Sequence, residues 1–206
     1  VRRVYLSLSK QIRKPDLIIF VDDGSPVPIG PNDLALVKDH KAAPTAIIRL
    51  KYNRGPAAAR NAGINFAIIS LGADPGRTIV FLLDIDCVAP ADWIQRGCDA
   101  VLVHRPHISN QSMPSEPLII AGISSGINPA SIYTHYNDLF GILNPRIKHC
   151  DLDAKQSEKQ PLYGPTCNLV VLPGSHNAWK ALPRFHKGFR EAAQEDLMFC
   201  LEAVYA

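Results

Sequence analysis

Apolar residues recur at every fourth position from Val4 to Ile12 and predict an amphipathic helix that Pro15 ends. The apolar run at 17–21 predicts a buried parallel strand, because a strand covered on both faces carries apolar residues without alternation. The two patterns then alternate along the first half of the chain. They predict a helix at about 33–40, a strand at 46–50, a helix at about 56–69 and a strand at 78–83.

The helix expected at 56–69 is rich in alanine and begins with proline, which is well tolerated in a first turn. We expect its inner face to carry Ala58, Ala62, Phe66 and Ile69.

Strands that alternate with helices at this spacing indicate an α/β domain with a mostly parallel sheet flanked by helices. Ligands of such domains gather beyond the carboxyl ends of the strands. The length of 206 residues fits one domain. The segment 105–164 is irregular apart from a strand expected at 118–121, and we expect it to shape a binding site.

The charge, the cysteines and the lengths of the apolar runs mainly show which partners and surroundings are not expected. The formal net charge of +3 is small and evenly spread, so no nucleic-acid partner is expected, and the basic residues near the start are interpreted as a solvated helix face. The five cysteines show no metal-ligand or disulfide spacing, which fits a reducing, cytoplasmic compartment. No apolar run approaches the roughly 20 residues of a membrane-spanning helix, whereas peripheral association with the cytoplasmic face of a membrane stays open.

The first acidic motif is Val21-Asp22-Asp23-Gly24-Ser25, at the end of the first predicted strand. Carboxylates at this place can accept hydrogen bonds from a base or a ribose. An Asp-Gly turn with a capping aspartate is the alternative, and the motif alone does not separate the two.

A glycine loop enters the alanine-rich helix through Asn53-Arg54-Gly55-Pro56 and leads to Arg60 one turn later. Small residues let the helix pack closely on a sheet, its N-terminus favours anionic groups, and Arg60 can donate to a nucleotide. A plain alanine-rich helix is the alternative, but it leaves the pair Arg60-Asn61 unexplained.

The second acidic motif, Asp84-Ile85-Asp86, follows the most hydrophobic predicted strand. Residues i and i+2 of a strand point the same way, so both carboxylates can converge on a hard cation such as Mg²⁺ or Mn²⁺ that bridges a diphosphate.

These motifs in this order resemble the donor-binding half of family 2 glycosyltransferases, which have the GT-A fold of the nucleotide-diphospho-sugar transferase superfamily. The resemblance covers about residues 1–100, the nucleotide-sugar-binding half, and leaves 101–206 as the acceptor-binding half of a single catalytic domain, 1–206. Two later segments are similar to the family's acceptor side. They are Gly164-Pro165-Thr166-Cys167-Asn168 and the region from Gly188-Phe189-Arg190-Glu191 to Gln194-Glu195-Asp196-Leu197.

The resemblance implies a role for each matching residue. Asp86, together with Asp84, would hold Mn²⁺ or Mg²⁺, and Asp196, or failing that Glu195, would be the base that deprotonates the acceptor hydroxyl. The residues implied to bind the nucleotide-sugar are Asp22, Asp23, Asn53, Gly55, Arg60 and Asp84, with Asp23 at the base and Asp84 near the ribose.

The expected activity is therefore metal-dependent transfer of a sugar, of hexosyltransferase type, from a nucleotide-diphosphate donor to a carbohydrate or other hydroxyl acceptor. A UDP-sugar donor and inversion by direct displacement are expected from the resemblance. A sugar-nucleotide nucleotidylyltransferase and a catalytically silent nucleotide-sugar-binding or interaction domain are the alternatives. We also expect the chain to lack the family's first strand and its C-terminal elements.

Overall fold

Helices and strands alternate along the chain in the computed structural model, which describes residues 1–34, 43–104, 117–128, 130–132, 134, 165–189 and 195–205. The α-helices are α1 (Arg2–Ser9), α2 (Pro31–Leu34), α3 (Pro56–Asn65), α4 (Trp93–His104), α6 (His176–Ala181) and α7 (Glu195–Tyr205). The structure also has a π-helix, η1 (Phe66–Ser70), and two 3-10 turns, η2 (Pro75–Arg77) and η4 (Thr166–Asn168). None of the described helices has the length and apolar character that crossing a membrane requires.

The described strands form two small sheets. Strands β1 (Ile18–Asp22) and β2 (Thr45–Arg49) pair in parallel, whereas β5 (Leu169–Leu172) lies between β3 (Val80–Leu82) and β4 (Leu118–Ala121) and is antiparallel to both. This α/β content is compatible with a GT-A domain. The expectation of a mostly parallel sheet is not confirmed, because a continuous apolar run marks a strand as buried but does not fix the direction of its neighbours.

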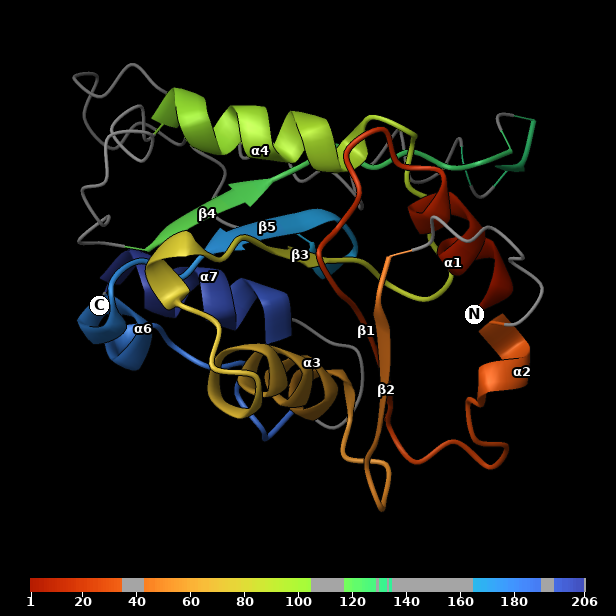
Figure 1. Cartoon of the computed structure of the whole chain (residues 1–206), viewed down its shortest axis with the longest axis horizontal. Coiled ribbons are helices and arrows are strands. Elements are labelled where there is room, and N and C mark those ends of the chain that lie inside the picture. Colours follow the sequence, from red (N-terminus) through yellow and green to blue (C-terminus); the bar gives the residue numbers. More distant parts are fainter. Residues whose placement is uncertain are drawn as a thin grey trace.

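The core is built around β5, whose four residues are all buried. Leu169 and Val171 face a cluster made by α3, α6 and α7, and Val170 and Leu172 face Val101 of α4. Figure 1 shows this layering, with α4 over one face of the β3–β5–β4 sheet and α3, α6 and α7 on the other side. Each of these buried aliphatic side chains contributes roughly 1.5–3 kcal/mol to folding.

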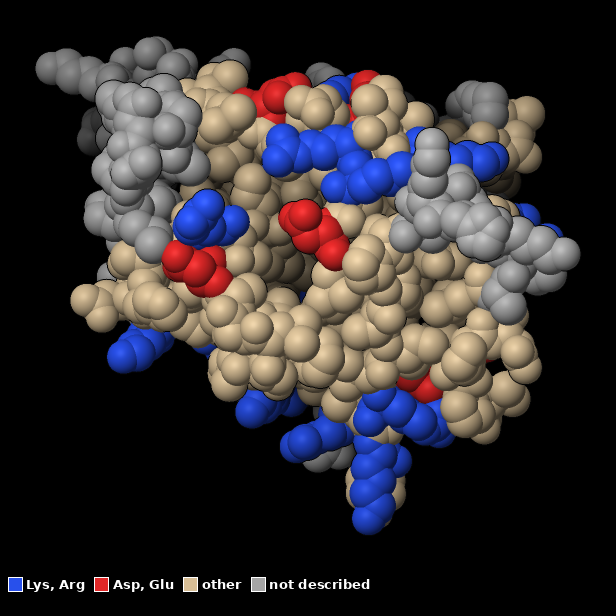
Figure 2. Space-filling view, in the orientation of Figure 1, with Lys and Arg blue, Asp and Glu red and all other residues tan. Residues whose placement is uncertain are grey.

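The observed helix boundaries differ from those that the apolar periodicity predicts. Helix α1 ends at Ser9, and the side chain of Ile12 is 73% exposed instead of belonging to the apolar stripe. In Figure 2 a band of basic side chains crosses the upper part of the face that is seen. Helix α2 covers the start of the predicted helix at 33–40, and residues 35–40 lie outside the described residues.

The predicted inner face of α3 was wrong by about one position. The residues that are buried on this helix and the π-helix that continues it are Ala57, Asn61, Ile64 and Ile68, while Ile69 is 67% exposed. Asn61 explains the difference, because a polar residue would be assigned to the outer face. Its amide donates to the backbone carbonyl of Phe185 at 2.7 Å and accepts from the Phe185 N–H at 3.0 Å, so both its nitrogen and its oxygen have a partner inside the core.

Candidate active site

Arg60 joins the two halves of the chain. Its guanidinium donates from Nη2 to Asp84 Oδ1 at 3.0 Å and from Nη1 to Glu195 Oε1 at 2.6 Å. These two partners are 24 and 135 residues away along the chain. The planar fork of an arginine can serve two carboxylates in fixed directions at once. Three of the predicted site residues therefore lie in one ion-paired cluster, between α3 and the start of α7 (Figure 1).

The two carboxylates of this cluster differ in their exposure. The side chain of Glu195 is 5% exposed and that of Asp84 is 41% exposed, while Arg60 is 14% exposed. A carboxylate buried like Glu195 stays charged only with a cation or several donors beside it. Arg60 also lies over the ring of Phe185, 5.6 Å from its centroid, so the position of the guanidinium is fixed by packing as well as by charge.

The second acidic motif lies in a turn. Strand β3 ends at Leu82, and the Cys87 N–H donates to the Asp84 carbonyl at 3.1 Å, which closes a turn over Asp84-Ile85-Asp86. The alternation of a strand therefore does not set the directions of the two carboxylates, contrary to the sequence argument. Asp86 is exposed at the tip of this turn, and its Oδ1 receives the weak thiol donor of Cys87 at 3.7 Å.

The Asp22 carboxylate is buried and accepts hydrogen bonds from other groups of the chain. Its side chain is 0% exposed and accepts from the N–H groups of Ser25 and Ile29, at 2.8 and 3.2 Å, and from the Arg49 guanidinium. Burial alone would raise the pKa of this carboxyl. The backbone hydrogen bonds and the charge of Arg49 outweigh it and lower the pKa to about 2. Asp22 thus organises the loop after β1.

Asp23 ties this loop to the glycine loop before α3. Its two carboxylate oxygens accept from the N–H groups of Arg54 and Gly55 at 2.9 and 2.7 Å. Asn53 accepts from the same Gly55 N–H at 3.2 Å. Gly24 makes the approach possible, since it has a φ of 70° and a Cβ there would lie 2.6 Å from the Asn53 nitrogen. The predicted donor-site residues of 22–55 therefore form one hydrogen-bonded unit.

The candidate base lies in the first turn of α7. Asp196 directly follows Glu195, and its Oδ1 accepts the Leu197 N–H at 2.9 Å. Acidic residues in a first turn are favoured by the helix dipole. Phe199, one turn later, stacks on Phe185 with ring centroids 4.2 Å apart, which fixes the helix against the core. Of the acceptor-side motifs, Gly164, Arg190, Glu191 and Gln194 lie outside the described residues.

The acidic turn fits a divalent cation that brings further ligands with it. Among the described residues no three His, Cys, Asp or Glu side chains form a group that could hold a metal ion by themselves. Mg²⁺ and similar hard cations, however, commonly bind through one or two carboxylates together with substrate phosphates and water. Asp86 is exposed and Asp84 is partly exposed, so their oxygens suit such a shared site.

Two cysteines beside this turn were missed in the sequence. Cys87 and Cys167 are 80 positions apart, yet each affects the pKa of the other, and neither is in a disulfide. The neighbouring Cys87 thiol lowers the pKa of Cys167 to about 7, whereas Cys167 and burial raise the pKa of Cys87. Neither spacing nor composition signals the pair, because it depends on how β3 and β5 align.

A comparison with models of protein families assigns the residues described above to a known family. The sequence model of glycosyl transferase family 2 matches residues 1–141, which include the loop after β1, the glycine loop, Arg60 and the acidic turn. The chain belongs to glycosyl transferase family 2. Searches among curated proteins and among solved structures gave no match. Membership supports a glycosyl transfer function and implies a nucleotide-sugar donor and an acceptor.

The buried charge of Asp22 makes stability depend on pH. The folded pKa of about 2 is below the ordinary 3.8, so folding favours the ionised carboxylate; this stabilisation is complete well above 3.8 and is lost as the pH falls through the folded pKa. Asp22→Asn should lower the free energy of unfolding by about 2 kcal/mol near neutral pH, and by less toward about pH 3. Urea unfolding at several pH values measures this. Asp16→Asn, at an exposed site before β1, is the control, and a pH-independent loss for Asp22→Asn would contradict the assignment.

The Arg60–Glu195 pair should be strongly coupled. Arg60→Ala alone is expected to cost about 3–5 kcal/mol, because it leaves the Glu195 carboxylate buried without its cation. In a double-mutant cycle with Glu195→Gln, urea unfolding should give a coupling energy of about 1–3 kcal/mol.

The matched control is the exposed pair Arg96–Asp92, whose nitrogen and oxygen are 3.7 Å apart. Its coupling energy should stay below about 0.5 kcal/mol. Additive effects at Arg60 and Glu195 would show that the ion pair does not hold the two halves together.

Proposed function

We propose that this family 2 glycosyl transferase moves a sugar from a UDP-sugar to an acceptor hydroxyl by direct displacement with inversion. The acceptor oxygen forms a bond to the anomeric carbon while the bond from that carbon to the diphosphate oxygen breaks. The hydroxyl proton passes to Asp196. Such a step needs a carboxylate near the acceptor and a positive charge near the departing diphosphate.

The observation that carries the proposal is the position of Arg60. One guanidinium contacts Asp84 of the acidic turn, on the donor side, and Glu195 beside the candidate base, on the acceptor side. A displacement reaction requires donor and acceptor groups at one centre in fixed relative positions. Arg60 also brings a positive charge to the place where the diphosphate would develop negative charge.

Each remaining residue has a role consistent with its hydrogen bonds. Asp23 would recognise the base, because an ionised carboxylate has about four acceptor positions and the two backbone N–H groups use only part of them. Asp22 would act on the nucleotide indirectly, by holding the loop that carries Asp23. Asn53 and Gly55 would shape the same loop.

The glycine loop before α3 also borders a hollow of about 590 Å³ that is lined in part by basic side chains. Lys51, Arg54 and Lys187 are among its lining residues, together with Leu50, Tyr52, Asn53 and Ala58. The hollow includes neither Arg60 nor the acidic turn, so we place the reaction at the ion-paired cluster and not in this hollow. Its three cations suit a negatively charged part of a substrate.

We assign the metal ion, Mn²⁺ or Mg²⁺, to Asp86 with Asp84. When bound, it would neutralise charge on the departing diphosphate. Asp86 is exposed at the tip of the turn, where a diphosphate and water can complete the coordination. Glu195, held by Arg60, would fix the start of α7 and so the position of Asp196.

Asp196→Asn tests the reaction. The substitution keeps the size of the side chain but removes the proton acceptor, so release of UDP from a panel of UDP-sugars should fall by about 10²–10⁴-fold. Binding of UDP with Mn²⁺, measured by calorimetry, should be unchanged. Glu202→Gln on the same helix is the control and should keep both properties.

Two outcomes would count against the proposal. If Asp196→Asn releases UDP at the rate of the unsubstituted chain, Asp196 is not the base. If the unsubstituted chain binds UDP but releases none from any donor, with acceptors supplied, the site is a nucleotide-binding site without transfer activity.

A further inference from the structure

The hollow beside the glycine loop lies between two segments that are far apart in the sequence. Lys51 and Arg54 come from the segment between β2 and α3, and Lys187 comes from the segment between α6 and α7. Figure 1 shows the segment after β2 at the lower edge of the molecule, and in Figure 2, in the same orientation, several basic side chains gather along that edge. The fold therefore brings a third cation beside the first two.

The backbone on both sides of the hollow is held in place. On one side, the Arg54 N–H donates to the Asp23 carboxylate at 2.9 Å. On the other side, the backbone N–H and carbonyl of Phe185, two residues before Lys187, are both hydrogen-bonded to the buried Asn61 amide. The positions from which the basic side chains extend are thus fixed before any ligand binds.

The charges in the hollow have one sign. No acidic residue is among the described residues that line it, and none of its three cations forms an ion pair with a described carboxylate, whereas Arg49 and Arg60 do. The three basic side chains are exposed. The ammonium of Lys51 also lies over the ring of Tyr52, 5.1 Å from its centroid. A concave surface that carries charges of one sign concentrates ligands of the opposite sign.

Three cations suit a phosphate group better than a carboxylate. A phosphate monoester carries about −1.5 to −2 charges at pH 7 and has three strong acceptor oxygens, whereas a carboxylate carries one charge. Lysine binds phosphate as a point charge, and the fork of an arginine can donate two parallel hydrogen bonds to it.

The hollow has room for more than a phosphate group. Its volume is about 590 Å³, compared with a share of about 30 Å³ for each molecule of liquid water. Tyr52 is 65% exposed, and Leu50 and Ala58 add apolar atoms to the lining. An exposed aromatic ring with a polar end suits the partly apolar face of a sugar ring.

The hollow and the ion-paired cluster lie on different sides of α3. Ala58 lines the hollow, whereas Arg60 carries the two ion pairs. Successive residues of an α-helix are rotated by about 100°, so these two side chains leave the helix in directions about 160° apart. Asn61, which binds the backbone of Phe185, points between them. A ligand in the hollow therefore leaves both ion pairs of Arg60 in place.

We propose that this hollow is a binding site for a phosphate ester, separate from the reaction centre at Arg60. The phosphate group accepts hydrogen bonds from Lys51, Arg54 and Lys187, and the group esterified to it lies against Tyr52. This site is additional to the one that the proposed function assigns to the diphosphate of the donor, at the acidic turn.

Phosphorus NMR tests the site, because inorganic phosphate, a hexose phosphate and UDP give separate signals. Titration with the chain should show saturable binding of the hexose phosphate and weaker binding of inorganic phosphate. Raising the concentration of NaCl should weaken both severalfold, since exposed charges are screened by salt.

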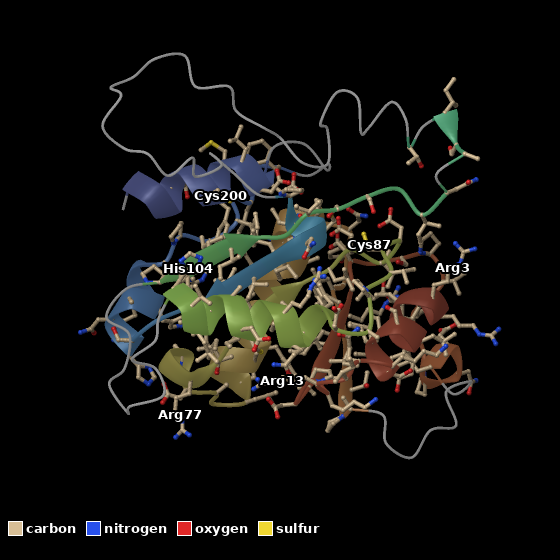
Figure 3. The ribbon with its side chains drawn as sticks, turned by 90° about the horizontal axis from the view of Figure 1, so that it is seen from above. Arg3, Arg13, Arg77, Cys87, His104 and Cys200 are labelled. Atoms are coloured by element: carbon tan, nitrogen blue, oxygen red, sulfur yellow. The ribbon has the colours of Figure 1, made fainter. Side chains whose placement is uncertain are left out.

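Substitution of the cations locates the binding. Lys51→Gln, Arg54→Gln and Lys187→Gln should each weaken binding of the hexose phosphate by about twofold to fivefold, and the triple variant by about tenfold or more. The matched controls are Arg77→Gln on η2 and Lys180→Gln on α6, which change exposed cations outside the hollow and should leave binding unchanged. Figure 3 labels Arg77 and shows its side chain pointing away from the fold.

Three results would overturn the proposal. The first is no saturable binding of either probe by the unsubstituted chain. The second is equal binding by the triple variant and the unsubstituted chain, or an equal loss in the control variants. The third is displacement of the hexose phosphate by UDP with Mn²⁺, because the hollow would then belong to the donor site.

The source of the phosphate is decided by incubating the chain with UDP-sugars and the hexose phosphate. A product heavier by one sugar identifies the acceptor as its carrier, and unchanged recovery identifies a ligand that binds without reacting; both results require the site. Binding of the hexose phosphate is measured without UDP. A chain that binds it but releases no UDP would thus contradict the proposed function and still support this site.

Discussion

The double ion pair of Arg60 is the interaction on which the rest of the site depends. Its two carboxylate partners come from the turn after β3 and from the first residue of α7, and without a shared cation they would repel each other. The arginine is itself carried by α3, which is fixed to the 185 region through Asn61 and the backbone of Phe185. The position of the acidic turn relative to the start of α7 is therefore set by one side chain, which the core fixes in place.

The loops around this cluster are ordered by carboxylates of a different kind. Asp22 and Asp23 accept hydrogen bonds from backbone N–H groups, Asp22 also accepts from Arg49, and Gly24 lets the two loops approach each other. These residues make the rim of the site rigid at the carboxyl ends of β1 and β2. The acidic turn is less constrained, since Asp86 is exposed, which suits a cation that arrives with the diphosphate. A rigid pair of loops beside an exposed acidic turn is consistent with the proposal that metal and nucleotide bind together.

Sequence reasoning found the motifs because each depends on local chemistry, and it failed where the answer depends on pairing between distant segments. The α/β class and the strand at β1 could be predicted from residue types and order, and the resemblance to family 2 implied that Arg60, Asp84 and Glu195 belong to one site. The antiparallel direction of β5 and the buried face of α3 could not be predicted. A polar residue such as Asn61 is assigned to the surface until the backbone groups that it satisfies are known. Likewise, the register of β3 against β5 brings the acidic turn next to the segment before β5.

The central claim is that nucleotide and metal share one site at the turn of Asp84 and Asp86. Electron paramagnetic resonance of Mn²⁺ tests it most directly, because free Mn²⁺ gives a strong signal that binding reduces. Titration of the chain with and without UDP should show that UDP strengthens Mn²⁺ binding severalfold or more, as reciprocal coupling requires, and that Asp86→Asn removes this gain. Equal Mn²⁺ binding with and without UDP, or a gain that survives Asp86→Asn, would contradict the account.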